Sequence, residues 1–204
     1  MTRPGKVVCA GRNYREHAKE LGNDVPAEPL IFLKPPSSLI RSGEAIVLPR
    51  ISRQVEYEGE IGILVGSPLR NASEREARSA IAGVVAVNDV TARDLQRSDG
   101  QWTRAKGFDS FCPASEPVPL RGPLEGLVVI TRLNGVERQR GAASDMVFSI
   151  PALLAYISGV MTLEPGDLVA TGTPAGVGVL APGDEVEIEI VGHASIRNPV
   201  IADS

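Results

Sequence analysis

The sequence predicts an α+β fold that is mainly β, with a few helices attached to its sheets. Short runs rich in valine and isoleucine recur along the 204 residues, and 21 glycines and 16 prolines are spread between them as turn residues. Three further segments carry helix-capping residues. No linker or low-complexity segment interrupts the chain, and its length suits one sizeable core, so we expect a single domain over residues 1–204.

The β-rich runs are bounded by Gly, Pro, Asn or Asp, and each is expected to form a strand. They cover residues 6–10, 60–66, 81–90, 127–135, 167–173 and 185–192. Pro-Gly turns precede the last two runs, and Asn134-Gly135 is a hairpin signal. The C-terminal half is therefore expected to be antiparallel or mixed β-sheet.

Helices are predicted over residues 13–22, 73–83 and 149–159. Each begins at a residue that favours the N-cap position, and each ends at a glycine. The first two also carry the glutamate that completes a capping box. The N-caps are Asn13, Ser73 and Ser149, the capping-box acids are Glu16 and Glu76, and the final glycines are Gly22, Gly83 and Gly159.

Composition excludes several classes of partner and site. The net charge of −4 provides no basic surface for nucleic acid or anionic membranes, and no run approaches the roughly 20 apolar residues that span a bilayer. We therefore expect a cytoplasmic protein with neither partner. Cys9 and Cys112 lack paired spacing and are expected to be buried thiols. With only two histidines, the inventory favours oxygen ligands for any metal.

Several familiar catalytic motifs are absent or fail in context. Residues 176–181, GVGVLA, match the letters of a dinucleotide fingerprint, but Pro174 and Pro182 flank them and no helix can begin there. The chain has neither a GxxxxGK[ST] phosphate loop nor a GxSxG nucleophile elbow. Phosphoryl transfer and serine hydrolysis therefore lack their usual residues.

The segment QVEYEGEIGILV, residues 54–65, places three acids on a predicted strand. Glu56, Glu58 and Glu60 alternate, so in one continuous strand they share a face and repel one another unless a cation lies between them. One interpretation is an edge strand with its charged face in water. Both faces become apolar directly after Glu60, however, which favours burial.

Asp89 ends one of the most apolar runs of the chain, residues 81–90. Taken alone it is typical of a turn or cap residue. Together with two of the glutamates it would supply three hard oxygen donors, a set that suits Mg²⁺ or Mn²⁺ and leaves coordination positions open for substrate. The acids thus explain one another's burial.

Cationic and basic side chains stand near these acids in sequence. Arg93, Gln96 and Lys106 follow Asp89 and would hold an anionic substrate, although each alone is typical of a solvated surface. His17 and Glu20 lie three apart on the first predicted helix, either as a surface pair or as a base oriented by a carboxylate. The loop at 170–178 offers bare backbone and the hydroxyl of Thr171 or Thr173, or it is only a tight turn; His193 lacks a partner and is expected to be structural.

Together these motifs resemble the fumarylacetoacetate hydrolase family over nearly the whole chain. The segments that carry the resemblance are GRNYREHAKE at 11–20, PLIFLKP at 29–35, YEGEIG at 57–62, NDVTARDLQ at 88–96, WTRAKGFDSFCP at 102–113, NGVERQRG at 134–141 and LEPGDLVATGTPAGVG at 163–178. The resemblance implies twisted mixed β-sheets in a sandwich or roll, and a homodimer. Many relatives have an extra N-terminal segment, whereas this chain starts almost at the core, so we expect no additional N-terminal domain. CPASEP at 112–117 departs from a common family pattern and weakens assignment to a narrow subfamily.

The resemblance also implies roles for individual residues. The metal ligands would be Glu58, Glu60 and Asp89, whereas Glu56 would not be a ligand. The water-activating pair would be His17 and Glu20, and Lys106 would also be catalytic. The substrate-binding residues would be Arg12, Arg93, Gln96 and Thr171.

The implied activity is that of an Mg²⁺ enzyme for 2-oxo acids, with Mn²⁺ or Ca²⁺ able to occupy the site. The substrate would be a 2,4-dioxo or 2-hydroxydienoic acid, converted through a metal-stabilised enolate by C–C bond hydrolysis or by decarboxylation. An alternative is isomerisation of 2-hydroxyhepta-2,4-diene-1,7-dioate in aromatic catabolism. From another class, a non-catalytic, metal-stabilised β-domain that acts as a binding module remains open.

Overall fold

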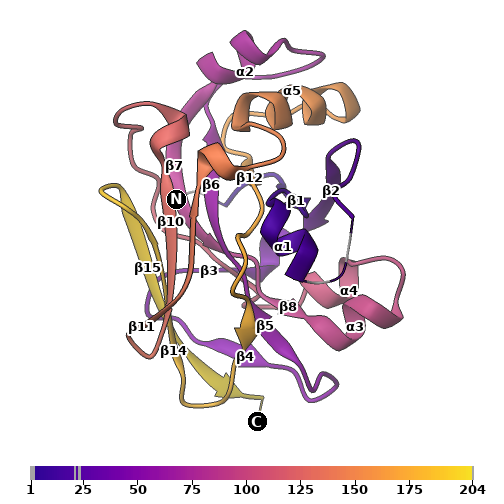
Figure 1. The fold of residues 1–204 in the computed structure, drawn as a ribbon, viewed down its shortest axis with the longest axis vertical. Coiled ribbons are helices and arrows are strands. Elements are labelled where there is room, and N and C mark those ends of the chain that lie inside the picture. The colour runs from indigo at the N-terminus through magenta and orange to yellow at the C-terminus, as the bar shows by residue number, and fades with distance from the viewer. Residues whose placement is uncertain (1–2, 21, 23, 204) are drawn as a thin grey trace.

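Two five-stranded β-sheets pack against each other, and short helices lie around them (Figure 1). The computed structural model describes residues 3–20, 22 and 24–203. The first sheet has the order β2-β1-β12-β6-β7, and the second has the order β11-β10-β14-β15-β4. Both contain parallel and antiparallel pairs. The predicted α+β fold, mainly β with mixed sheets, is confirmed.

The strands of the first sheet are β1 (Val7–Gly11), β2 (Leu30–Lys34), β6 (Gly59–Val65), β7 (Ile81–Asn88) and β12 (Leu168–Ala170). Those of the second are β4 (Ile46–Leu48), β10 (Val128–Leu133), β11 (Val136–Ala142), β14 (Glu185–Ile190) and β15 (Ala194–Ala202). A three-stranded sheet joins β13 (Gly178–Val179), β5 (Val55–Tyr57) and β8 (Thr91–Ala92), and β3 (Leu39–Ile40) pairs with β9 (Cys112–Pro113).

The helices are short and lie outside the sheets. They are α1 (Arg15–Glu20), α2 (Glu74–Ser79), α3 (Arg93–Ser98), α4 (Thr103–Lys106) and α5 (Ile150–Val160), with 3-10 turns at Pro36–Ser38, Leu124–Gly126 and Ala143–Asp145. Helices α2 and α5 pack together at one end of the molecule, while α3 and α4 lie together on one side (Figure 1). Among the described residues, no helix is long and apolar enough to cross a membrane.

Two of the predicted helix starts are confirmed. Ser73 and Glu76 form the expected capping box of α2, and the Ser149 side chain accepts the Ala152 N–H at the start of α5. The end predicted for α2 at Gly83 is wrong, because Ile81 already belongs to β7 and pairs with β6. Sheet pairing therefore takes over from local helix propensity at this boundary.

Asn13 is not the N-cap that the sequence suggested. Its amide bonds instead to loops distant in sequence, donating to Phe148 O at 3.1 Å and Thr171 O at 2.8 Å. Helix α1 begins two residues later, and the Tyr14 carbonyl accepts the Ala18 N–H at 3.0 Å. Leu21, within the predicted helix, lies outside the described residues.

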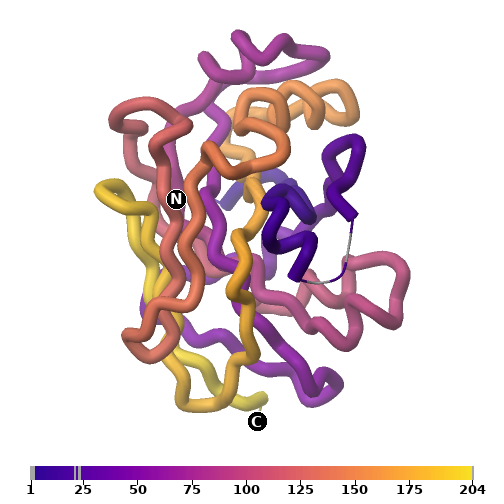
Figure 2. The backbone as a smooth tube through the Cα atoms, in the orientation of Figure 1, coloured from indigo at the N-terminus to yellow at the C-terminus, as the bar shows by residue number. Residues whose placement is uncertain are grey.

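The acidic segment 54–65 is two strands and not one. The chain leaves the three-stranded sheet after β5, passes through Glu58, and enters the first large sheet as β6. Figure 2 shows this continuous path of the backbone between layers. Alternation correctly suggested that the acids are near one another, but it could not show that the middle acid sits where the chain changes sheets.

The core lies between the two large sheets, where β6 and β7 face β10 and β14. Ile61, Ile63, Val84 and Ile188 are at most 1% exposed in this layer. Gly59 permits the closest approach, because a Cβ there would lie 2.0 Å from Thr131 Oγ1. The two sheets can meet behind the acidic segment only if residue 59 has no side chain.

We expect Gly59→Ala to destabilise the fold. Overpacking a tight interior costs about 1–3 kcal/mol, and the new methyl would also lie 3.0 Å from the Ile188 side chain. Gly159→Ala is the matched control, because nothing lies within 4 Å of its Cβ position in α5 and alanine favours a helix by up to about 1 kcal/mol. Urea unfolding should show a lower midpoint for Gly59→Ala only. Equal midpoints would contradict the packing argument.

Candidate active site

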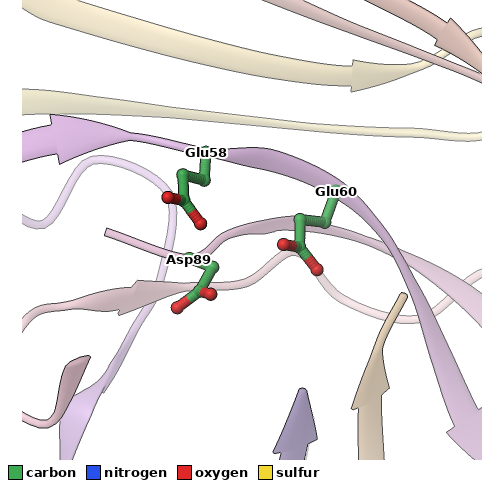
Figure 3. Close-up of side chains that lie close together, drawn as sticks. All are labelled: Glu58, Glu60 and Asp89. Carbon is green, nitrogen blue, oxygen red and sulfur yellow. The ribbon is translucent and has the colours of Figure 1, made fainter. Parts of the chain in front are cut away.

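Three buried carboxylates converge at one point of the structure. Glu58, Glu60 and Asp89 are at most 4% exposed, and each offers an oxygen within 4.8 Å of the others (Figure 3). Glu58 lies between β5 and β6, Glu60 is the second residue of β6, and Asp89 follows β7. The sequence prediction that these three acids come together is therefore met by the geometry.

The backbone fixes the two acid-bearing segments to each other. The Asp89 N–H donates to Glu58 O at 2.8 Å, and the Glu58 N–H donates to Asn88 Oδ1 at 2.9 Å. These bonds replace the regular ladder where β5 ends and β6 has not begun. The positions of Glu58 and Asp89 are thus set by the same local ring of hydrogen bonds.

Two buried lysines pair with two of these acids, Glu58 and Asp89. Lys106 Nζ lies 2.8 Å from Glu58 Oε2 and 2.6 Å from Asp89 Oδ2, and Lys34 Nζ lies 2.6 Å from Asp89 Oδ1. The sequence indicates a role for Lys106 but none for Lys34. The available signal was a lysine that ends the apolar run LIFLK before two prolines, a place where burial requires an acidic partner.

Arg93 lies between the first two acids of the alternating segment. Its Nε is 2.8 Å from Glu56 Oε2, while its Nη2 pairs with Glu58 and its Nη1 donates to the Gln96 side chain. This arginine provides the cation that neighbouring carboxylates require. Glu56 is 6% exposed, so the solvated edge strand is excluded, and its role in the structure is to hold Arg93.

The donor set fits a divalent cation. Burial, and then the charges of Asp89 and Glu58, raise the pKa of Glu60 well above its usual range, and no Lys or Arg of the described chain pairs with it. Burial also favours the neutral form of Glu58, yet Lys106 and Arg93 hold its pKa far below the ordinary value. Three hard oxygens with one acid lacking a counter-charge match Mg²⁺ or Mn²⁺.

Helix α1 brings the predicted base to the same place. His17 is 4% exposed, and its Nδ1 lies 3.2 Å from Glu20 Oε2. Glu20 also accepts the Gly176 N–H, so it links the helix to the loop after β12. The pair exists as predicted from the i, i+3 spacing, while its catalytic role stays a prediction.

A cavity joins these groups, with about 400 Å³ of empty space when its open mouth is included. Phe32 and Trp102 form one wall, edge to face at 5.3 Å between ring centroids. The polar lining residues are Arg12, His17, Glu58, Glu60, Asp89, Arg93, Gln96, Lys106 and Thr173. A single cavity therefore contains the acids, the base candidate and an aromatic surface.

Thr171 lies just outside that lining. Its hydroxyl donates to Ile61 O at 2.8 Å, and its carbonyl accepts from Asn13, so its contacts are with the surrounding backbone. Thr173 lines the cavity two residues later. The predicted role of Thr171 in substrate binding stays a prediction, and Thr173 is the hydroxyl that the structure brings to the cavity.

Comparison with known proteins finds relatives that cover nearly the whole chain. An oxaloacetate tautomerase of Escherichia coli K12 is 41% identical over 93% of this chain and 90% of its own length. The crystal structure of a 2-hydroxyhepta-2,4-diene-1,7-dioate isomerase from Mycobacterium marinum is 42% identical, with a TM-score of 0.91 over 99% of this chain and 76% of its own. A fumarylpyruvate hydrolase from Pseudomonas aeruginosa, solved with Mn²⁺ and pyruvate, is 30% identical, with a TM-score of 0.92 over 97% of this chain and 90% of its own.

The family model described as fumarylacetoacetate (FAA) hydrolase C-terminal matches residues 6–201. This match spans both large sheets and every residue of the cavity. The chain belongs to the fumarylacetoacetate hydrolase family.

Proposed function

We propose that this protein is a divalent-metal-dependent enzyme that acts on 2-oxo acids, by C–C bond hydrolysis or decarboxylation. The observation that carries the proposal is the buried triad of Glu58, Glu60 and Asp89 in a cavity that also holds a histidine–carboxylate pair. The P. aeruginosa relative solved with Mn²⁺ and pyruvate supports both the metal and the 2-oxo acid. Mg²⁺ and Mn²⁺ suit the donors equally, and Ca²⁺ can also occupy such a site.

The balance of charge in the cavity favours an anionic substrate. Four carboxylates, those of Glu56, Glu58, Glu60 and Asp89, face the three cations of Lys34, Arg93 and Lys106. A divalent cation would make this set positive by one charge. When bound, the metal supplies Lewis-acid stabilisation of the negative charge that develops on the oxygen at C2.

Arg12 provides a further positive charge at the cavity wall. Arg93, Lys34 and Lys106 are each paired with acids, whereas Arg12 has no ion pair within the described part of the chain. Its backbone is left-handed, with φ of 56°, an unusual conformation for a residue other than glycine. We infer that Arg12 binds a second carboxylate, so that dicarboxylic 2-oxo acids are preferred.

His17 would act as the base for C–C bond hydrolysis. Glu20 fixes the Nδ1 side of the imidazole, which leaves Nε2 for a proton of water near the C4 carbonyl. The same base could move a proton at carbon, at C3 for tautomerisation of oxaloacetate or at C5 for isomerisation of a 2-hydroxy-2,4-dienedioate. The names of the E. coli and M. marinum relatives support this second reaction type.

A non-catalytic, metal-stabilised binding module would need only the triad. Assays of acylpyruvates, fumarylpyruvate, oxaloacetate and 2-hydroxyhepta-2,4-diene-1,7-dioate, with Mg²⁺ or with EDTA, test the proposal. We expect turnover of at least one substrate that EDTA abolishes. Metal-independent turnover would refute the metal mechanism, and a protein that binds metal but converts none of them would favour the binding module.

The homodimer also remains a proposal, based on the family resemblance.

Metal binding should distinguish Glu60 from Glu56. Glu60→Gln should weaken Mn²⁺ binding by more than about 100-fold, because losing a ligand exceeds the usual cost of losing a residue behind one. Glu56→Gln is the matched control from the same alternating segment, and it should retain Mn²⁺ because Glu56 contacts Arg93 outside the triad. Isothermal titration calorimetry measures both affinities. Equal losses in the two variants would contradict the assignment of ligands.

Substitution of His17 should separate the function of the base from that of the metal ligands. His17→Ala should retain Mn²⁺ affinity but lose about 10²–10⁴-fold in kcat for hydrolysis of an acylpyruvate, the range of general acid–base catalysis. Glu20→Gln should cause a smaller loss, because the imidazole remains but loses its charged partner. Steady-state assays at saturating metal measure these effects. Normal hydrolysis by His17→Ala would show that another group is the base.

Arg12 should influence which 2-oxo acids the enzyme prefers. Arg12→Met should lower kcat/KM for oxaloacetate or fumarylpyruvate by about 10–100-fold, mainly through KM, since a charged hydrogen bond contributes about 1.5–3 kcal/mol. Acetylpyruvate, which has one carboxylate, should change little. The two substrates are compared with the same enzyme preparation. An equal loss for both would place Arg12 on the part of the substrate that they share.

A further inference from the structure

A buried polar cluster lies on the far side of the ligand-bearing strand from the cavity. Gly59 separates the ligands Glu58 and Glu60, and the position of its missing Cβ faces Thr131 and Gln139 of the β10–β11 hairpin. Gln139 is 1% exposed and does not line the cavity. It therefore contacts the site only through other residues.

The Gln139 side chain makes four hydrogen bonds. Its Oε1 accepts the Gly59 N–H at 3.0 Å and the Thr131 hydroxyl at 2.7 Å, and its Nε2 donates to Thr173 Oγ1 at 2.8 Å and Pro174 O at 2.7 Å. A backbone N–H can only donate and a carbonyl can only accept. The contacts with Gly59 and Pro174 therefore fix which end of the amide is oxygen.

This orientation determines where the Thr173 proton goes. Because Nε2 donates to Thr173 Oγ1, the hydroxyl must place its own hydrogen elsewhere, and Gly59 O accepts it at 2.9 Å. The Thr173 hydroxyl can then offer the cavity only a lone pair. Gln139 thus constrains both the peptide between two ligands and the hydrogen-bonding character of a cavity residue.

The loop that contains Thr173 has no space to adjust on its own. A Cβ on Gly176 would lie 2.1 Å from Arg138 O, and one on Gly141 would lie 2.6 Å from the Pro174 ring. The loop therefore lies directly on β11. A substitution at Gln139 would therefore alter the positions of Thr173 and Gly59, because the close packing leaves no free space for other adjustments.

We propose that Gln139 is a positioning residue for the active site, which acts from behind the ligand strand by holding the Gly59 peptide and fixing Thr173 as a hydrogen-bond acceptor. This inference rests on the proposed function, because its catalytic consequence requires a metal-dependent reaction in the cavity. Its structural consequence, an immobilised Gly59 amide, does not depend on that reaction.

The test compares Gln139→Met with Asn198→Ala. Asn198 is also 1% exposed, and its amide also donates to two backbone carbonyls, Arg41 O and Glu44 O at 2.8 Å, but it lies on β15 outside the cavity. For Gln139→Met we expect kcat or Mn²⁺ affinity to fall by about 10–100-fold, the usual loss for a residue behind a ligand. Asn198→Ala should change neither, although both variants lose stability.

Two readouts do not depend on turnover. Mn²⁺ binding can be followed by quenching of Trp102, which lines the cavity and is the only tryptophan of the chain, and hydrogen exchange at the Gly59 amide should accelerate in Gln139→Met only. Gln139→Glu is the second variant, in case the methionine variant does not fold. It keeps acceptors for Gly59 and Thr131 but loses both donors, so it should retain Gly59 protection and still lose activity.

The outcomes separate this inference from the proposed function. If the wild-type protein converts no 2-oxo acid and binds no Mn²⁺, the proposed function fails, while unequal Gly59 exchange in the two variants still supports the positioning contact. If Gln139→Met loses no more than twofold in kcat and Mn²⁺ affinity while its stability falls like that of Asn198→Ala, Gln139 is only structural and the inference is overturned.

Discussion

The backbone bond from the Asp89 N–H to the Glu58 carbonyl is the contact on which the arrangement of the site depends. Glu58 lies where the chain leaves one sheet for another, and Asp89 follows the last residue of β7. Neither has the regular ladder that fixes a residue in mid-strand. This bond replaces that ladder together with the bond from the Glu58 N–H to the Asn88 side chain, which is 30 residues away in sequence. The two bonds join the acid-bearing segments.

Electrostatics makes such a site costly in the absence of compensating charges. Buried carboxylates at this spacing oppose one another, and their desolvation alone disfavours ionisation. The structure answers with Lys34, Lys106 and Arg93, each of which donates from a different element of the chain. These cations leave Glu60 without an ion pair among the described residues. A divalent ion, as proposed above, would supply the counter-charge that this set lacks.

The sequence was informative where the chemistry repeats at short range. Period-two alternation grouped Glu56, Glu58 and Glu60, and the family resemblance then singled out Glu58 and Glu60. The i, i+3 spacing paired His17 with Glu20. It could not show the break at Glu58, because the exchange of sheets depends on which strands pair. Lys34 and Gln139 were missed for a related reason: an isolated lysine or glutamine has no local pattern, and its meaning comes from partners 55 and 80 residues away. Asn13 was misassigned because a good N-cap side chain found tertiary acceptors instead.

The loop from Thr171 to Gly176 connects three parts of the site that are distant in sequence. Its Gly172 N–H donates to Glu60 of the acidic triad, its Thr173 hydroxyl donates to Gly59 O between Glu58 and Glu60, and its Gly176 N–H donates to the Glu20 carboxylate that bonds to His17. An acid of the triad, a cavity hydroxyl and the histidine–carboxylate pair are therefore positioned by six consecutive residues. Because the loop lies against β11 without room for a Cβ at Gly176, the position of the loop depends on the second sheet. That sheet contributes none of the three acids. The β10–β11 hairpin therefore helps to fix the shape of the site. The positions of the cavity residues depend on how closely the two sheets pack.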